Sequence, residues 1–137
     1  MAMKRKLRMG MIGGTMEAFI GEIHRKAARM DGLIDIVAGT FSRDPAKSRT
    51  TGARLHLPAD RVYANVKDMI RRESARPAAE RLDFITVVTP NVAHFEAVKL
   101  ALLAGFHVVC EKPLAYTLEE GLAIRQLVAK TRRQFMV

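Results

Sequence analysis

Short apolar runs alternate with longer segments of helical spacing along the whole chain. Six runs are strand-like, and they lie at residues 7–12, 33–38, 62–63, 82–89, 106–110 and 135–137. The run at 82–89, LDFITVVT, is rich in β-branched residues and ends at Pro90, which cannot continue a central strand. Continuous apolar strands, as opposed to alternating ones, indicate burial on both faces of a sheet.

The segments between these runs have the spacing of helices, at residues 18–30, 45–55, 66–72, 92–103 and 118–129. In the first, four apolar residues fall on one stripe that we expect to face the core: Phe19, Ile23, Ala27 and Met30. The polar segment 73–81 contains Pro77 and predicts a surface loop. Strands that alternate with helices predict a parallel sheet with crossover helices. The sequence therefore predicts one doubly wound α/β domain, a Rossmann fold, over residues 1–137.

Composition excludes several classes of protein. The chain is 49% hydrophobic, which is enough for a core and too much for a disordered segment. No apolar run approaches the roughly 18 residues of a membrane-spanning helix, and the apolar part of the N-terminus is too short for a secretory signal. The single cysteine, Cys110, cannot form an internal disulfide, so we expect a buried thiol in a reducing cytoplasm. No His, Cys and Asp group has metal-ligand spacing, and we expect no metal.

The charge is strongly basic. The chain has 23 Lys and Arg against 14 Asp and Glu, a formal net charge of +9. Such an excess suits nucleic acid or an anionic ligand such as a phosphorylated cofactor. The basic residues fall in short groups at 4–8, 25–29, 71–72 and 130–133, and aromatic residues are only 6%. A stacking nucleic-acid surface needs aromatics among its charges. Solvated faces and cofactor steering are therefore favoured, with a nucleic-acid-binding domain as the lesser alternative.

The first strand-like run leads into a glycine turn, GGTMEA at residues 13–18, and a helix follows. A dinucleotide fingerprint, G-x-G-x-x-G/A, occupies this kind of junction. Gly13 fills the first position, and Ala18 fills the third, where a small residue lets helix and strand pack closely. Thr15 stands where the second glycine belongs, and its side chain either crowds a phosphate or donates a hydrogen bond to it. We expect Gly13, Gly14, Thr15 and Ala18 to bind a dinucleotide, although such turns also occur for structural reasons.

The end of the second strand-like run indicates which dinucleotide binds. An acidic residue there binds the ribose 2′-hydroxyl, whereas an arginine accommodates a 2′-phosphate. The sequence has Ser42 and Arg43 here, a hydroxyl and guanidinium pair suited to phosphate. Asp44, followed by Pro45, is typical of a helix N-cap. We therefore expect NADP in preference to NAD, with NAD as the alternative.

Two later segments follow strands. The first is TPN at residues 89–91 with His94 beyond it, and its plain interpretation is a strand-to-helix turn in which Asn91 caps the helix. The second is EKP at residues 111–113. A lysine at the carboxyl end of a parallel strand lies in the crevice where such sheets bind ligands. That position favours a functional role for Lys112 over a surface one.

Together these segments resemble the N-terminal half of the glucose–fructose oxidoreductase/inositol dehydrogenase (Gfo/Idh/MocA) family. Its members have a glycine turn on the first strand, T-P-N-x-x-H after the fourth and E-K-P after the fifth. Gly21 and His24, in AFIGEIH, also fit the family pattern, whereas Thr15 departs from it. The matching segments outside the glycine turn, which the resemblance implies are near the cofactor, consist of Thr89, Pro90, Asn91, His94, Glu111, Lys112 and Pro113.

The resemblance implies an oxidoreductase that passes a hydride between a nicotinamide cofactor and a carbinol carbon of a sugar or cyclitol. It implies that Lys112 contacts the nicotinamide ribose and helps to orient substrate, which makes it the candidate catalytic residue. It also implies a second α/β domain with the substrate pocket and an acid/base, so we expect this chain to be truncated in its sixth strand. On this hypothesis the chain is an inactive cofactor half, and homo-oligomers form only with the full-length parent. A nucleotide-sensing module without turnover is the other alternative.

Overall fold

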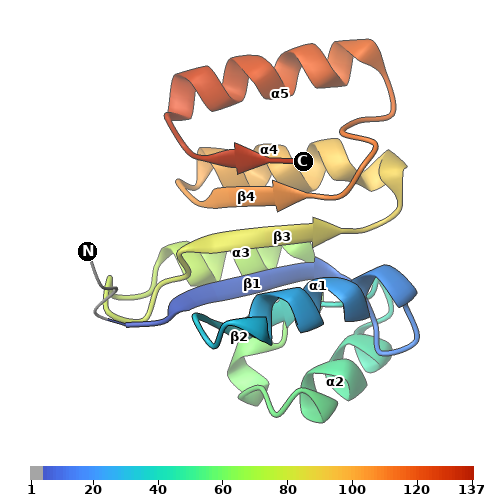
Figure 1. The fold of residues 1–137 in the computed structure, drawn as a ribbon, viewed down its shortest axis with the longest axis vertical. Coiled ribbons are helices and arrows are strands. Elements are labelled where there is room, and N and C mark those ends of the chain that lie inside the picture. The colour runs from blue at the N-terminus through green and yellow to red at the C-terminus, as the bar shows by residue number, and fades with distance from the viewer. Residues whose placement is uncertain (1–4) are drawn as a thin grey trace.

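A computed structural model describes residues 5–137, and its strands form one parallel sheet in the order β2-β1-β3-β4-β5 (Figure 1). The strands are β1 (Leu7–Gly13), β2 (Ile34–Thr40), β3 (Phe84–Val88), β4 (His107–Cys110) and β5 (Phe135–Met136). The helices are α1 (Phe19–Met30), α2 (Pro45–Arg54), α3 (Val66–Ser74), α4 (His94–Leu103) and α5 (Leu118–Thr131), with short 3₁₀ turns η1 (Ala59–Arg61) and η2 (Asn91–Ala93). The predicted doubly wound α/β fold is confirmed. Lys4, in the first basic group, lies outside the described residues.

The strand order reverses at β1, which pairs with β2 on one side and with β3 on the other. The register places Ile12 beside Val87 and Gly13 beside Val88, so the carboxyl ends of β1 and β3 lie together. The connections that leave these two ends diverge to opposite faces, and such a switch point is where doubly wound sheets bind ligands. The predicted strand at 62–63 is reduced to a single parallel bridge between Val62 and Gly39.

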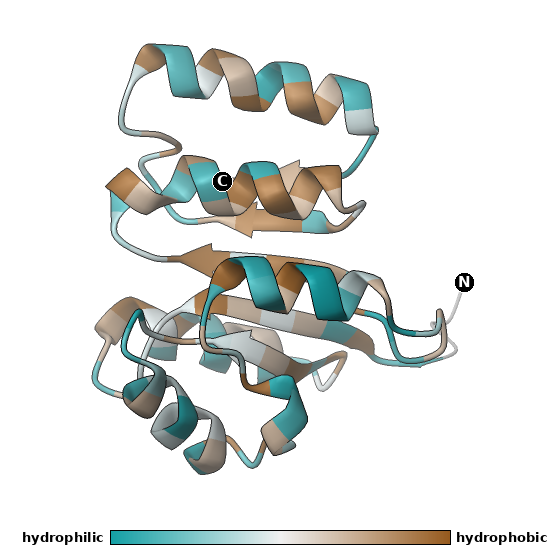
Figure 2. Cartoon of the chain, turned by 180° about the vertical axis from the view of Figure 1, so that it is seen from behind, coloured by the Kyte–Doolittle hydropathy of each residue, from teal (hydrophilic) through white to brown (hydrophobic). Residues whose placement is uncertain are grey.

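Helices α1 and α2 cover one face of the sheet, α3 and α4 cover the other, and α5 packs against α4 (Figures 1 and 2). Hydrophobic residues dominate β3, β4 and α4 in Figure 2, which fits their position in the middle of the fold. The larger core cluster includes Met69, Ile85, Val98 and Leu102, all fully buried. Among the helices that the structure describes, none combines the length and apolar character that a membrane span needs.

Helix α1 buries a different side from the one predicted. The predicted stripe is exposed, with Phe19 at 76%, Ile23 at 42% and Met30 at 80%, and Ala27 also faces solvent. The buried residues of the helix are Gly21 and Arg25. The prediction of a core-facing stripe is wrong because the helix approaches the sheet through a glycine, which leaves no room for large apolar side chains on that side.

A buried carboxylate corrects the prediction for the segment 73–81. Glu73 lies in the last turn of α3 and is 0% exposed. It accepts a hydrogen bond from Tyr63 Oη at 2.7 Å and two from the Arg61 guanidinium at 3.0 and 2.7 Å. Burial and the neighbouring Glu73 raise the pKa of Tyr63 to about 12. A buried carboxylate is tolerated when donors surround it, and these donors come from residues earlier in the chain.

Tyr63 connects this polar cluster to the end of β2 through Ser48. Ser48 Oγ donates to the carbonyl of Tyr63 at 3.1 Å and accepts from the N–H of Phe41 at 3.0 Å. All three residues are buried, so the hydrogen bonds are shielded from water. Phe41 is therefore held firmly in place, and the segment with Ser42 and Arg43 begins directly after it.

A glycine in α2 tests how closely this half of the fold is packed. A Cβ at Gly52 would lie 2.3 Å from Cγ2 of Val62, whereas a Cβ at Gly121 in α5 would meet nothing within 4 Å. We expect Gly52→Ala to lower the free energy of unfolding by about 1–3 kcal/mol through overpacking. Gly121→Ala should raise it by roughly 0.5–1 kcal/mol because alanine favours the helix. Urea unfolding of both variants measures this, and a Gly52→Ala chain as stable as wild type would contradict the packing.

Candidate functional site

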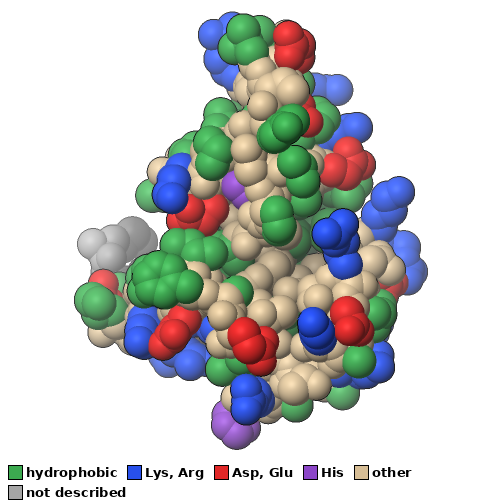
Figure 3. Space-filling view, turned by 90° about the vertical axis from the view of Figure 1, so that its right-hand side faces the viewer, with side chains coloured by type: hydrophobic (Ala, Val, Ile, Leu, Met, Phe, Trp, Pro, Cys, Tyr) green, Lys and Arg blue, Asp and Glu red, His purple; other side chains and the backbone are tan. Residues whose placement is uncertain are grey.

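A cavity of about 710 Å³ opens at the carboxyl edge of the sheet, at the switch point between β1 and β3. Figure 3 faces this edge and shows a recessed surface of backbone and apolar side chains with Lys and Arg around it. The cavity is lined by the ends of three strands and the turns after them, including the predicted Gly13, Gly14, Thr15, Ala18, Ser42, Arg43, Thr89 and Pro90. Its size and its mostly apolar walls with a few polar groups are typical of a small-molecule site.

The glycine turn begins with two residues in the left-handed region of backbone space. Gly13 has φ +85° and Gly14 has φ +77°. A Cβ on Gly13 would lie 2.9 Å from the backbone of Val88 and Thr89, so the ends of β1 and β3 touch directly. Glycine is the residue that allows both the turn and this contact. The tight turn expected at Gly13 is present.

Helix α1 meets the glycine turn at Gly21. A Cβ at this position would lie 2.6 Å from the Cα of Gly14, which leaves space only for a hydrogen atom. The close approach that the fingerprint assigned to Ala18 is therefore made at Gly21, and Ala18 is instead the N-cap residue of α1. The loop between turn and helix is longer than the fingerprint spacing, which is why counting from Gly13 selected the wrong residue. The pattern AFIGEIH already contained the right one.

The N-terminus of α1 faces the cavity without a side-chain cap. The first intrahelical acceptor is the carbonyl of Ala18, which receives the N–H of Glu22 at 3.2 Å. The N–H groups of Phe19, Ile20 and Gly21 precede that bond, and helix geometry gives them no intrahelical partner. Together with the helix dipole, such groups attract phosphate and other anions.

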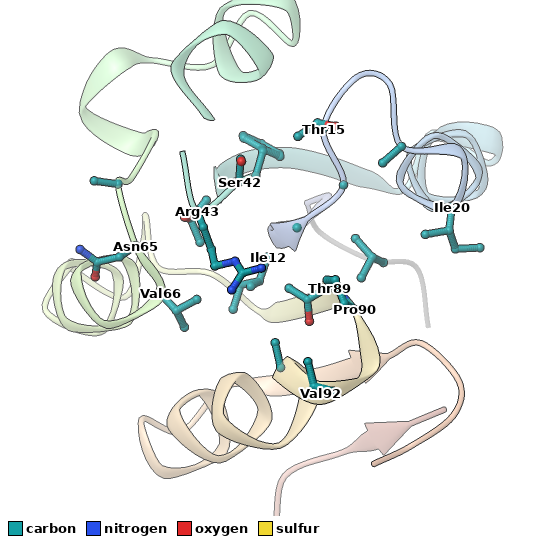
Figure 4. A pocket seen from close by; sticks show the side chains of 18 residues that line it. Ile12, Thr15, Ile20, Ser42, Arg43, Asn65, Val66, Thr89, Pro90 and Val92 are labelled. Carbon is teal, nitrogen blue, oxygen red and sulfur yellow. The ribbon is translucent and has the colours of Figure 1, made fainter. Parts of the chain in front are cut away.

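The end of β2 carries a helix cap and two side chains that line the cavity. Asp44 Oδ1 accepts the N–H of Ala46 at 2.9 Å and caps α2, which confirms the predicted cap. Ser42 and Arg43 line the cavity, and Figure 4 shows the Arg43 side chain reaching into it across from Thr89. A guanidinium in this position is ready to bind an anionic group on a ligand.

The end of β3 carries two buried polar atoms without partners. Thr89 Oγ1 and Asn91 Oδ1 have no hydrogen bond to any group in residues 5–137. Asn91 does not cap a helix, contrary to the prediction, because η2 and α4 both begin without a side-chain cap bond. Buried polar atoms are rarely left unsatisfied, and beside a cavity they indicate where a polar ligand binds.

His94 lies inside the protein and not on the cavity wall. It is 1% exposed, with Nδ1 3.0 Å from the carbonyl of Pro113 and Nε2 2.8 Å from the carbonyl of Thr89. A carbonyl only accepts, so each contact uses a ring N–H as donor, and a neutral ring supplies one such donor at a time. His94 thus links the turn after β3 to the turn after β4.

Glu111 links the turn after β4 to helix α1. Its Oε1 lies 3.0 Å from Nε2 of His24, and its Oε2 accepts the backbone N–H of Lys112 at 3.1 Å. The hydrogen bond with His24, together with the nearby charge of Lys112, lowers the pKa of the Glu111 carboxyl. The side chain of Lys112 is exposed, just after the carboxyl end of β4. Five of the predicted site residues do not line the cavity: Asn91, His94, Glu111, Lys112 and Pro113.

The single cysteine is buried away from solvent. Cys110 is 1% exposed, and burial together with the nearby Glu111 raises the pKa of its thiol to about 12. A thiol with a raised pKa stays protonated near neutral pH, and the thiolate is the reactive form. Residues 5–137 bring no three His, Cys, Asp or Glu side chains together as a metal site. The groups available to a ligand are backbone N–H groups, hydroxyls, an amide and a guanidinium, and this set fits a phosphorylated nucleotide.

The chain is similar to a large group of oxidoreductases. A family profile described as "Oxidoreductase family, NAD-binding Rossmann fold" (Gfo/Idh/MocA) matches residues 7–137. The uncharacterized oxidoreductase YfiI of Bacillus subtilis is 36% identical over 127 residues, which are 92% of this chain and 32% of that protein. Inositol 2-dehydrogenase of Corynebacterium glutamicum is 28% identical over 93% of this chain and 34% of its own length.

The solved structures that match this chain include oxidoreductases, as the sequence relatives do. An inositol dehydrogenase homolog from Azotobacter vinelandii, determined in complex with NAD+, matches with TM-score 0.91 and 38% identity over 96% of this chain and 33% of that one. The same protein with NADH and myo-inositol matches equally well, with TM-score 0.91 over 96% of this chain and 34% of that one. The chain thus spans about a third of the length of the relatives it matches.

The contact between Gly21 and Gly14 gives a direct test of the cavity as a binding site. We expect Gly21→Ala to weaken NADH binding about tenfold or more, because a Cβ displaces the glycine turn although alanine itself favours the helix. Fluorescence titration with NADH measures the Kd. Gly121→Ala, a helical glycine with open space around it, is the matched control and should bind like wild type. Equal Kd values for Gly21→Ala and wild type would remove the glycine turn from the site.

Proposed function

Because this chain belongs to the Gfo/Idh/MocA oxidoreductase family, whose NAD-binding Rossmann fold covers residues 7–137, we propose that it is the cofactor-binding part of a sugar or cyclitol dehydrogenase. Family membership makes the cofactor a nicotinamide dinucleotide. When bound, this cofactor supplies the hydride chemistry, and the protein supplies binding and orientation. The observation that carries the proposal is the convergence, on one cavity, of an uncapped helix terminus, a glycine turn and the unsatisfied hydroxyl of Thr89.

Three regions at the cavity each suit one part of a dinucleotide. The N–H groups of the glycine turn and of the first turn of α1 suit the diphosphate. Ser42 and Arg43, at the end of β2, suit the ribose of the adenosine half and a 2′-phosphate on it. Thr89 and Asn91 offer a hydroxyl and an amide to the polar groups of the nicotinamide half.

Lys112 is the residue of this chain that we propose for contact with the nicotinamide ribose and the substrate. Its side chain is exposed at the carboxyl end of β4, and its backbone is fixed by Glu111, which His24 holds in turn. A fixed backbone lets a flexible ammonium group donate hydrogen bonds to ligand hydroxyls from a constant origin. Cyclitols and sugars are favoured as substrates because inositol dehydrogenases recur among the relatives and solved structures at 28% and 38% identity.

We expect the chain to bind NADPH more tightly than NADH because Arg43, and not a carboxylate, stands at the end of β2. A charge-assisted hydrogen bond to phosphate contributes about 1.5–3 kcal/mol, so Arg43→Ala should weaken NADPH binding roughly tenfold or more and leave NADH binding nearly unchanged. Calorimetric titration of both cofactors measures this. Lys47→Ala, which removes an exposed cation of α2 outside the cavity, is the control. Tighter binding of NADH, or no effect of Arg43→Ala on NADPH, would refute the assignment of Arg43.

We expect the 137-residue chain to show no dehydrogenase turnover. Catalysis needs a proton acceptor within hydrogen-bond reach of the reacting hydroxyl and a wall that holds the sugar. The resemblance to the family implies that a further domain supplies both. The assay follows the absorbance of reduced nicotinamide at high protein concentration with a panel of sugars and inositols. Robust turnover that disappears in Lys112→Ala would show that the catalytic machinery lies within these residues.

A further inference from the structure

Arg25 is a buried cation directly below the glycine turn. The residue is 4% exposed, and its Nη1 donates to the carbonyl of Gly14 at 2.6 Å while Nη2 lies 3.4 Å from the carbonyl of Thr15. Sequence reasoning placed it in a solvated basic group with Lys26 and Arg29. Those two neighbours are exposed, so Arg25 alone of the group points into the protein.

The charge of Arg25 has no carboxylate partner within the part of the chain that the structure describes. Glu22, one turn earlier in α1, forms its ion pair with Lys26 at 2.7 Å instead. Burial lowers the pKa of Arg25, which reflects the cost of removing its charge from water. Two neutral carbonyls offset only part of that cost. A buried cation retained on these terms is suited to an anion that binds nearby.

The peptide geometry of the turn shows how Arg25 acts on such an anion. Within residues 5–137 only the Lys112–Pro113 bond is cis, so the peptides after Gly14 and Thr15 are trans. In a trans peptide the carbonyl and the following N–H point in opposite directions. The Gly14 carbonyl is turned toward Arg25, and the Thr15 carbonyl lies near Arg25 while it accepts the N–H of Ala18 at 3.0 Å. The N–H groups of Thr15 and Met16 therefore point away from Arg25, and neither donates to another backbone carbonyl in the described residues. Successive N–H groups on one side form an anion-binding concavity.

We propose that Arg25 is a positioning residue for the diphosphate of the dinucleotide: it holds the Gly14 carbonyl inward and, together with the N–H of Ala18, the Thr15 carbonyl, so that the N–H groups of Thr15 and Met16 face the anion with a positive charge behind them. This inference rests on the proposed function of the cavity. In the fingerprint, the second glycine lets the backbone approach the diphosphate. Here a buried arginine of α1 contributes to that role. Thr15, which stands at that glycine's position, is tolerated here because Arg25 fixes the direction of the Gly14–Thr15 peptide.

The test compares two probes that differ only in phosphate, ADP and adenosine, by NMR titration of the 137-residue chain. Arg25→Met keeps much of the side-chain volume but removes the charge and both donors. We expect it to weaken ADP binding about tenfold or more and to change adenosine binding by less than about twofold. Arg29→Met, which removes an exposed cation one turn later in α1, should leave both affinities unchanged. Arg25→Lys keeps the charge without the fork of donors and should fall between wild type and Arg25→Met.

The amide signals of the wild-type chain provide an independent measurement if Arg25→Met does not fold. ADP should shift the amide protons of Thr15 and Met16 downfield, and adenosine should not. Equal losses of ADP and adenosine affinity in the variants, or wild-type amides at Thr15 and Met16 that do not respond to ADP, would overturn the role of Arg25. A wild-type chain that binds neither ADP nor NADH would instead overturn the proposed function of the cavity.

Discussion

The close approach of three backbone segments at the glycine turn governs the rest of this structure. The end of β1 touches the end of β3 at Gly13, and the turn touches α1 where Gly14 meets Gly21. Because no side chain separates these segments, the first turn of α1 opens onto the cavity and its N–H groups stay available. The same approach decides which side of α1 is buried, and it turns Phe19 and Ile23 outward.

Polar cross-links between the turns hold this arrangement in place. His94 joins the turns after β3 and β4, Glu111 joins the turn after β4 to His24 in α1, and Arg25 fixes the glycine turn from below. On the far side, Glu73 and its donors steady the chain near the end of β2. Turns that carry binding groups are thus tied to each other and to rigid elements, which is how a scaffold keeps a site in order without a ligand.

The sequence predicted the features that depend on local chemistry. The β-branched run at 82–89 formed a buried strand, Asp44 capped the helix that Pro45 begins, and the two glycines after β1 made the tight turn. All of these follow from a few adjacent residues. The parallel sheet follows from the alternation of such segments along the chain.

The features that depend on distant partners escaped prediction. Periodicity showed that α1 is amphipathic but could not show that a glycine on the other side would meet Gly14. The charges of Glu73 and Arg25 predicted that both side chains are exposed. Both are buried, because they bind donors and acceptors that lie ten or more residues away in the sequence. Asn91 is of a residue type that often caps helices, but its Oδ1 accepts no hydrogen bond from residues 5–137. In each case tertiary contacts outweighed a local preference.

The most direct test of this account is a crystal structure of the 137-residue chain grown with NADPH. The account predicts density for the diphosphate at the N-terminus of α1 and the glycine turn, with the 2′-phosphate at Arg43 and the nicotinamide half beside Thr89 and Asn91. Density for the dinucleotide on another surface, such as the arginines of α3, would contradict it, as would a cofactor bound in the cavity with its diphosphate away from the glycine turn.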